Sequence, residues 1–175
     1  MPANDNRSRP RALGGLVLVC DLLETLLGWV AGLGLAAFVV TVLIDVIYRE
    51  VLAQPLFAPS EISVCLFIWS TLLAAAVAAR RNAHFVMDFL PASISPGLDF
   101  SLKLLAAILA IVFSGIITYY GYGMAERGWM RVSPMSGFSM LWFYTSMPVA
   151  GAAFLLFTTE ALALVIADGP KRGVS

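Results

Sequence analysis

The sequence predicts an all-α integral membrane protein in which four transmembrane helices have antiparallel neighbours and both termini lie in the cytoplasm. The first observation is composition: 60% of the 175 residues are hydrophobic and 13% are charged, whereas soluble domains average about 45–50% and about 25%. A soluble domain of this size has too little interior for so much apolar surface. The second observation is that the charged residues leave four long uncharged stretches. The third is that lysine and arginine gather on one side of those stretches.

The four uncharged stretches contain 20, 18, 22 and 28 residues. Each fits one crossing, because a helix needs about 20 apolar residues to span the hydrocarbon core. We expect the spans at about 24–47, 61–80, 103–125 and 138–160. They form one membrane domain, 21–166, between an N-terminal tail, 1–20, and a C-terminal tail, 167–175. A membrane barrel would need short alternating segments, but these runs are continuous.

The first span follows a tail that carries three arginines, at positions 7, 9 and 11. We interpret this tail as uncleaved, because the apolar run before Cys20 is short and Val19 is bulky where a lipoprotein cleavage site needs a small residue. Gly28 and Gly32 are four residues apart, a spacing that lets another helix approach closely. Tyr48 closes the span as an interfacial aromatic residue.

The second span begins at Ser60 and Glu61, where a hydroxyl can cap free amides and an acid complements the positive end of the helix. It ends at Arg80 and Arg81. If the helix continues, the next pair four residues apart faces one another, as does a similar pair at the outer end of the first span. These pairs are His84 with Asp88 and Asp45 with Arg49. Capping, orientation and surface ion pairing explain these groups, and contact with a partner protein or lipid is the alternative.

The third and fourth spans show packing and anchoring features. Small residues form a second ladder in the third span, and tyrosine and tryptophan gather near the outer loop, where aromatic residues anchor at the interface. The ladder is Ala106, Ala110 and Ser114; the aromatic residues are Tyr119, Tyr120, Tyr122, Trp129 and Trp142. Pro148 lies inside the fourth span, where it removes one backbone donor.

The orientation follows from the distribution of positive charge. Eight lysine and arginine residues lie in the two tails and in the loop between the second and third spans, against three on the other side. Cytoplasmic segments carry the excess of positive charge. Both termini are therefore expected in the cytoplasm.

No constellation of residues predicts catalysis or cofactor binding. His84 is the only histidine, which excludes haem held by two histidines, and with Asp88 and two distant cysteines it makes no zinc site. No glycine-rich phosphate loop is present. No ionisable group lies near the centre of a span, where it would mark a transport pathway. We therefore expect a protein that is not an enzyme, binds no cofactor or metal, has no nucleic-acid partner and keeps its charged groups unburied at the ends of the spans.

Three motifs lie at the ends of the predicted spans. The first is "YREVLAQPLFAPSE", with Arg49, Pro55 and Glu61; the second is "ARRNAHFVMD", with Arg80, Arg81, His84 and Asp88; the third is "LWFYTSMPVAG", with Trp142, Tyr144, Pro148 and Gly151. In order and spacing these motifs resemble the small membrane subunit of tripartite ATP-independent periplasmic (TRAP) transporters, the DctQ-like family. The chain lacks the tryptophan that the family often has before the acid and the glycine late in the second helix.

The resemblance implies a scaffold subunit in the bacterial inner membrane that supports a large, DctM-like permease subunit. The complex would take up an organic acid with sodium, delivered by a periplasmic substrate-binding protein. Eight residues are then candidates for contact with partners or lipid. They are Arg49, Glu61, Arg80, Arg81, His84, Asp88, Trp142 and Tyr144.

Two other functions stay open. One is a self-sufficient four-helix exporter that acts as a dimer; the absence of a carboxylate in mid-membrane disfavours it, and Glu24 is its nearest candidate. The other is a membrane enzyme or electron carrier, which the single His84 and the separated Cys20 and Cys65 disfavour.

Overall fold

The structure is a computed structural model that describes residues 11–51, 57–89, 96–133 and 137–168. Within these ranges the side chains of 11–13, 57–58, 82–89, 96, 99 and 168 are not described. The four helices are α1 (Arg11–Val51), α2 (Phe57–Phe89), α3 (Pro96–Gly128) and α4 (Leu141–Asp168).

All four helices are long and apolar enough to cross a membrane. The candidate spans are Gly14–Val51, Pro59–Arg81, Phe100–Gly128 and Leu141–Ala167. This confirms the prediction of an all-α protein with four membrane-spanning helices. Helix α1 begins inside the predicted N-terminal tail, and α4 begins three residues after the predicted start of the fourth span.

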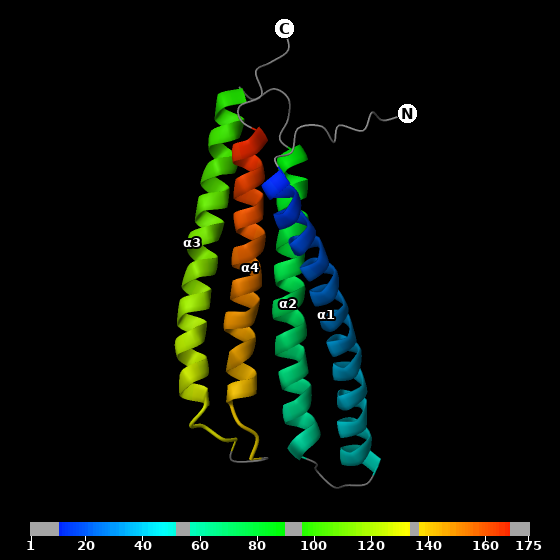
Figure 1. The fold of residues 1–175 in the computed structure, drawn as a ribbon. Helices are drawn as coiled ribbons and strands as arrows, with labels where there is room; N and C mark the ends of the chain where they lie inside the picture. Colours follow the sequence, from blue (N-terminus) through cyan, green and yellow to red (C-terminus); the bar gives the residue numbers. More distant parts are fainter. Residues whose placement is uncertain (1–10, 52–56, 90–95, 134–136, 169–175) are drawn as a thin grey trace, which may run out of the picture.

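The helices lie side by side in one layer, in the order α1, α2, α4, α3 (Figure 1). Helix α2 packs against α1 and α4, and α4 packs against α2 and α3. The central helices are accordingly the most buried: within an apolar stretch of 18 residues in each span, 39% of the residues are buried in α4 and 28% in α2, against 11% in α3 and 6% in α1. Apolar side chains of the edge helices are exposed along most of their length. Such surfaces suit lipid or a partner in the membrane.

Helices α3 and α4 approach closely because glycines face the partner helix. A Cβ on Gly121 would lie 2.9 Å from the backbone nitrogen of Pro148, and one on Gly151 would lie 2.7 Å from Oγ1 of Thr118. Toward the end of α4, Ser114 and Thr158 face each other with their hydroxyl oxygens 3.5 Å apart. Close backbone contact of this kind holds helices together in lipid, where apolar burial gives little driving force.

The small residues expected to pack do so only in part. A Cβ on Gly28 or Gly32 would meet nothing within 4 Å, whereas one on Gly34 would lie 2.5 Å from the Ser70 hydroxyl. Helix α1 therefore packs on α2 through Gly34, and Phe38 adds a ring contact with Phe67, 5.3 Å between centroids. In the third-span ladder Ser114 is buried, while Ala106 is exposed.

The connection from α3 to α4 carries a short hairpin. Val132 and Ser139 form an isolated antiparallel bridge, and the Ser133 amide donates to the Phe138 carbonyl at 2.8 Å. Gly137 has a φ of 75°, a left-handed conformation that favours glycine. The hairpin brings Ser133 next to the start of α2, where it contacts Glu61.

Candidate functional site

A cluster of five charged side chains joins three helices near one end of the layer. Its members, which we call the Arg80 cluster, are Asp21 and Glu24 of α1, Arg80 and Arg81 of α2 and Glu160 of α4. Asp21 and Glu24 are three residues apart, so one face of α1 presents both carboxylates to α2.

Arg80 is the centre of this cluster. Its Nε and Nη2 donate to the two oxygens of Glu160 at 2.7 and 2.8 Å. Nη2 also donates to Asp21 at 2.7 Å, and Nη1 donates to Glu24 at 2.5 Å. Planar guanidinium with five donors suits this bidentate and bridging geometry, which an ammonium group cannot reproduce.

The two central charges are buried. Arg80 is 4% exposed and Glu160 is 1% exposed. The guanidinium carbon of Arg80 lies 5.5 Å from the ring centroid of Phe157, one turn before Glu160, and the ring adds a cation–π contact. Burying a charge costs several kcal/mol unless it is paired and hydrogen-bonded. Here both oxygens of Glu160 and donors on all three nitrogens of Arg80 have partners.

Next to the Arg80 cluster, small side chains let α1, α2 and α4 pack closely. Cys20, Ala76 and Ala153 form a buried apolar group with Phe157. The described part of the chain holds no group of three or more His, Cys, Asp or Glu arranged to bind a metal ion.

The expectation that no charged group is buried was therefore wrong for Arg80 and Glu160. The sequence did hold a signal. Arg80 follows Glu61 by 19 residues and Glu24 precedes Asp45 by 21, which at 1.5 Å per residue is about 30 Å along each helix. Opposite charges at equal depth in neighbouring helices predict pairing. Charged residues were used only to mark the ends of the spans, so pairing between helices was not considered.

The opposite end of the layer carries a second set of polar groups. The Ser133 hydroxyl donates to Oε1 of Glu61, which ties the hairpin to the start of α2. On α1, Nη2 of Arg49 donates to Oδ2 of Asp45 at 3.0 Å. Arg49 is 60% exposed. Oδ1 of Asp45 is buried and has no hydrogen-bond partner among the described residues.

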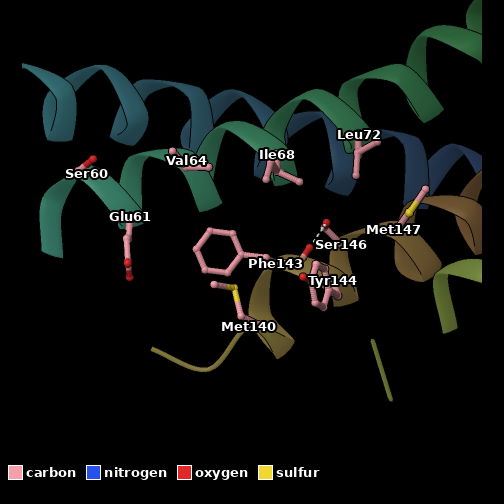
Figure 2. A pocket seen from close by; sticks show the side chains of 10 residues that line it. All are labelled: Ser60, Glu61, Val64, Ile68, Leu72, Met140, Phe143, Tyr144, Ser146 and Met147. Atoms are coloured by element: carbon pink, nitrogen blue, oxygen red, sulfur yellow. Dashed lines mark hydrogen bonds between the residues drawn. The ribbon is translucent and has the colours of Figure 1, made fainter. Parts of the chain in front are cut away.

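An apolar groove of about 430 Å³ runs between α2 and α4 next to Glu61 (Figure 2). Its walls are Ser60, Glu61, Val64, Ile68, Leu72, Met140, Phe143, Tyr144, Ser146 and Met147. Phe143 points from α4 toward Val64 and Ile68 of α2. A smaller groove of about 220 Å³ shares Glu61 and Phe143 and is also lined by Trp142. The indole nitrogen of Trp69 donates to the Trp142 carbonyl at 2.9 Å and bridges the two helices.

The eight candidate contact residues thus fall into groups. Glu61, Trp142 and Tyr144 come together where α2 and α4 line the grooves, and Arg49 lies on α1 at the same end. Arg80 and Arg81 belong to the Arg80 cluster. His84 and Asp88 lie in α2, but their side chains are outside the described residues. Sequence reasoning missed Asp21, Glu24 and Glu160 as partners of Arg80.

Sequence comparison adds the family to this geometry. The sequence profile of "Tripartite ATP-independent periplasmic transporters, DctQ component" matches residues 38–168, about three quarters of the chain. The chain belongs to the DctQ family. The resemblance inferred from the three motifs is confirmed, and with it the assignment to a membrane transport system.

Two curated relatives support the DctQ assignment. The chain is 29% identical over 109 residues to the sialic acid TRAP transporter small permease protein SiaQ of Vibrio cholerae serotype O1, a match that covers 62% of each chain. It is 22% identical over 121 residues to the sialic acid TRAP transporter permease protein SiaT of Haemophilus influenzae, which covers 69% of this chain and 20% of the relative. The matched part thus spans less than two thirds of each relative.

The DctQ match includes Arg80, Arg81 and Glu160 but begins after Asp21 and Glu24. The two residues of the Arg80 cluster that α1 supplies therefore lie outside the matched residues.

Proposed function

We propose that the protein is the small membrane subunit of a TRAP transporter, in which it braces a large, DctM-like permease subunit. The observation that carries this proposal is the open layer of four helices with exposed apolar edges. A free-standing bundle buries one face of each helix against the others. An open layer in lipid fits a partner that packs against it.

The Haemophilus relative supports a large partner. Only 20% of that permease matches this chain, so a segment like this one shares a polypeptide with a much larger remainder. In the proposed complex the large subunit carries the substrate and the sodium ions, and a periplasmic binding protein delivers an organic acid. The four helices of this chain hold no charge at mid-membrane that could serve such a pathway.

The proposed topology has antiparallel neighbours and both termini in the cytoplasm of a bacterium, with the chain in the inner membrane. Contacts between helices agree with it: Asp21, near the start of α1, meets Arg80, near the end of α2. The excess of lysine and arginine in the tails and in the loop after α2 supports the direction. The Arg80 cluster then lies at the cytoplasmic boundary, and Glu61 lies at the periplasmic one.

The candidate contact residues receive roles within this topology. Arg49, Glu61, Trp142 and Tyr144 face the large subunit or the binding protein on the outer side. On the inner side Arg81, His84 and Asp88 face the partner or lipid headgroups. For Arg80 the proposed role is to join helices of this chain, because its guanidinium is enclosed by carboxylates of its own chain.

Co-purification tests this function. An affinity-tagged copy of the chain, expressed with a DctM-like large permease subunit from the same bacterium, should retain that subunit through size-exclusion chromatography in mild detergent. An unrelated four-helix membrane protein of similar size serves as the control. Elution of the tagged chain without the large subunit would contradict the proposal.

A further inference from the structure

Helix α1 is held to the layer by very little buried apolar surface. Of its described residues only Cys20 and Ala31 are buried. In a bilayer this matters, because lipid tails are as apolar as leucine and contact between apolar helix faces gives little driving force for association. Close packing and polar contacts must therefore fix the position of α1.

Polar contacts from α1 to the other helices gather at one end. The carboxylates of α1 that bond to another helix bond to Arg80 or Arg81, and Cys20 of α1 adds a side-chain hydrogen bond with Glu160 of α4. The remaining side-chain hydrogen bonds of α1 stay within the helix, as at Thr25, Thr41 and Arg49. The packing of α1 against α4 also lies toward this end, where Cys20 and Ala31 join buried groups that include Ala153 and Ala150.

The Arg80 cluster has two separable parts. Glu160 takes the side of the guanidinium formed by Nε and Nη2, and it joins α2 to α4 in a buried site. Glu24 and Asp21 take Nη1 and the second donor of Nη2, and they join α2 to α1. Asp21 is 61% exposed and Arg81 is 69% exposed. The α1 part of the cluster is therefore open to the surroundings, whereas the α4 part is enclosed.

We propose that the bonds from Asp21 and Glu24 to Arg80 and Arg81 determine where α1 docks, and that α1 can leave the layer while α2 and α4 stay joined through Arg80 and Glu160. In this conformational mechanism Arg80 keeps the central helices α2 and α4 joined and binds the edge helix α1 reversibly. The contacts concerned lie within this chain, so the outcome is independent of the proposed partner.

Disulfide cross-linking between introduced cysteines measures the α1–α2 contact and the α2–α4 contact separately. Phe38 and Phe67 have ring centroids 5.3 Å apart and report α1 against α2; Leu73 and Ala150 pack in one buried group and report α2 against α4. Each pair is replaced by cysteine in the full chain with Cys20→Ala and Cys65→Ala, and oxidation is followed in bacterial membrane vesicles.

The double substitution Asp21→Asn with Glu24→Gln removes both carboxylate charges of α1 and leaves Glu160 in place. We expect oxidation of the 38–67 pair to slow several-fold and oxidation of the 73–150 pair to stay unchanged. Asp45→Asn is the matched control, because among the described residues its carboxylate pairs only with Arg49 on the same helix, and it should leave both rates unchanged.

Two results would overturn the proposal. An unchanged rate at the 38–67 pair in the double variant would mean that packing at Gly34 positions α1 without the ionic bonds. Equal slowing at both pairs would mean that the cluster acts as a single unit on the whole fold and that α1 does not dock separately.

Discussion

The contacts of Arg80 require a guanidinium group, because a positive charge alone cannot make them. Its side-on pair with Glu160 and its bridges to Asp21 and Glu24 use donors on all three nitrogens. Arg80→Lys keeps the charge but offers one nitrogen, so some buried carboxylate oxygens lose their partners. An unsatisfied buried charged group costs about 1–3 kcal/mol or more.

We therefore expect Arg80→Lys to lower the midpoint of thermal unfolding in lipid nanodiscs by several degrees. Arg80→Met should lower it further, because it leaves Glu160 buried without a counter-charge, a change that costs about 3–5 kcal/mol. Arg81→Lys is the control, since its side chain is largely exposed. Equal midpoints for Arg80→Lys and Arg81→Lys would refute the structural role of Arg80.

Arg49 differs from Arg80 because its ion pair is exposed and lies within one helix. Exposed pairs four residues apart contribute only about 0.3–0.5 kcal/mol. Arg49→Ala should thus leave the unfolding midpoint almost unchanged, as measured by the same nanodisc assay. If the outer contact is real, the variant should still bind the substrate-binding protein more weakly in a pull-down. A large drop in the midpoint would show that Arg49 acts within its own fold.

At the scale of the helices, the existence of each helix could be predicted, but neither its full length nor its packing face could; α1, for example, has 41 residues and begins at Arg11. Uncharged stretches of about 20 residues reveal a span directly. They leave open which side of the helix meets a neighbour: Gly28 and Gly32 had the expected spacing, yet Gly34 faces α2. In lipid the apolar pattern carries no inside-outside signal, so the sequence lacks the periodicity that identifies the core face of a soluble helix.

The packing of α3 on α4 yields a prediction with a control two residues away. Gly121→Ala places a Cβ 2.9 Å from the Pro148 backbone nitrogen, whereas a Cβ on Gly123 meets nothing within 4 Å. Forcing an extra methyl into a close contact costs about 1–3 kcal/mol. Gly121→Ala should lower the unfolding midpoint, and Gly123→Ala should not. Similar midpoints for the two variants would refute the close α3–α4 contact.

At the scale of the whole molecule, the layer has charged and polar groups at both ends and an apolar middle. The sequence predicted this arrangement and the family. The motifs around Arg49, Arg80 and Trp142 lie within the matched residues 38–168, and the match confirms the family. The joining of Asp21, Glu24 and Glu160 around Arg80 was not predicted, because it depends on which helices are neighbours. Neighbour order in a four-helix protein follows from packing that charge counts do not encode.

The proposed orientation has its own consequence. A reporter enzyme that is active only in the periplasm, fused after residue 168, should be inactive, and one active only in the cytoplasm should be active. The same two reporters fused in the connection between α3 and α4 should give the reverse pattern. Periplasmic activity at the C-terminal fusion would refute the cytoplasmic location of the Arg80 cluster.

The central claim is that this chain supports transport without carrying substrate itself. Uptake of a radiolabelled organic acid into liposomes tests it most directly, with a sodium gradient and the binding protein present. The chain alone should give no uptake above empty liposomes, the large subunit alone should give little, and the two together should give sodium-dependent uptake. Uptake by this chain in the absence of the large subunit would contradict the account.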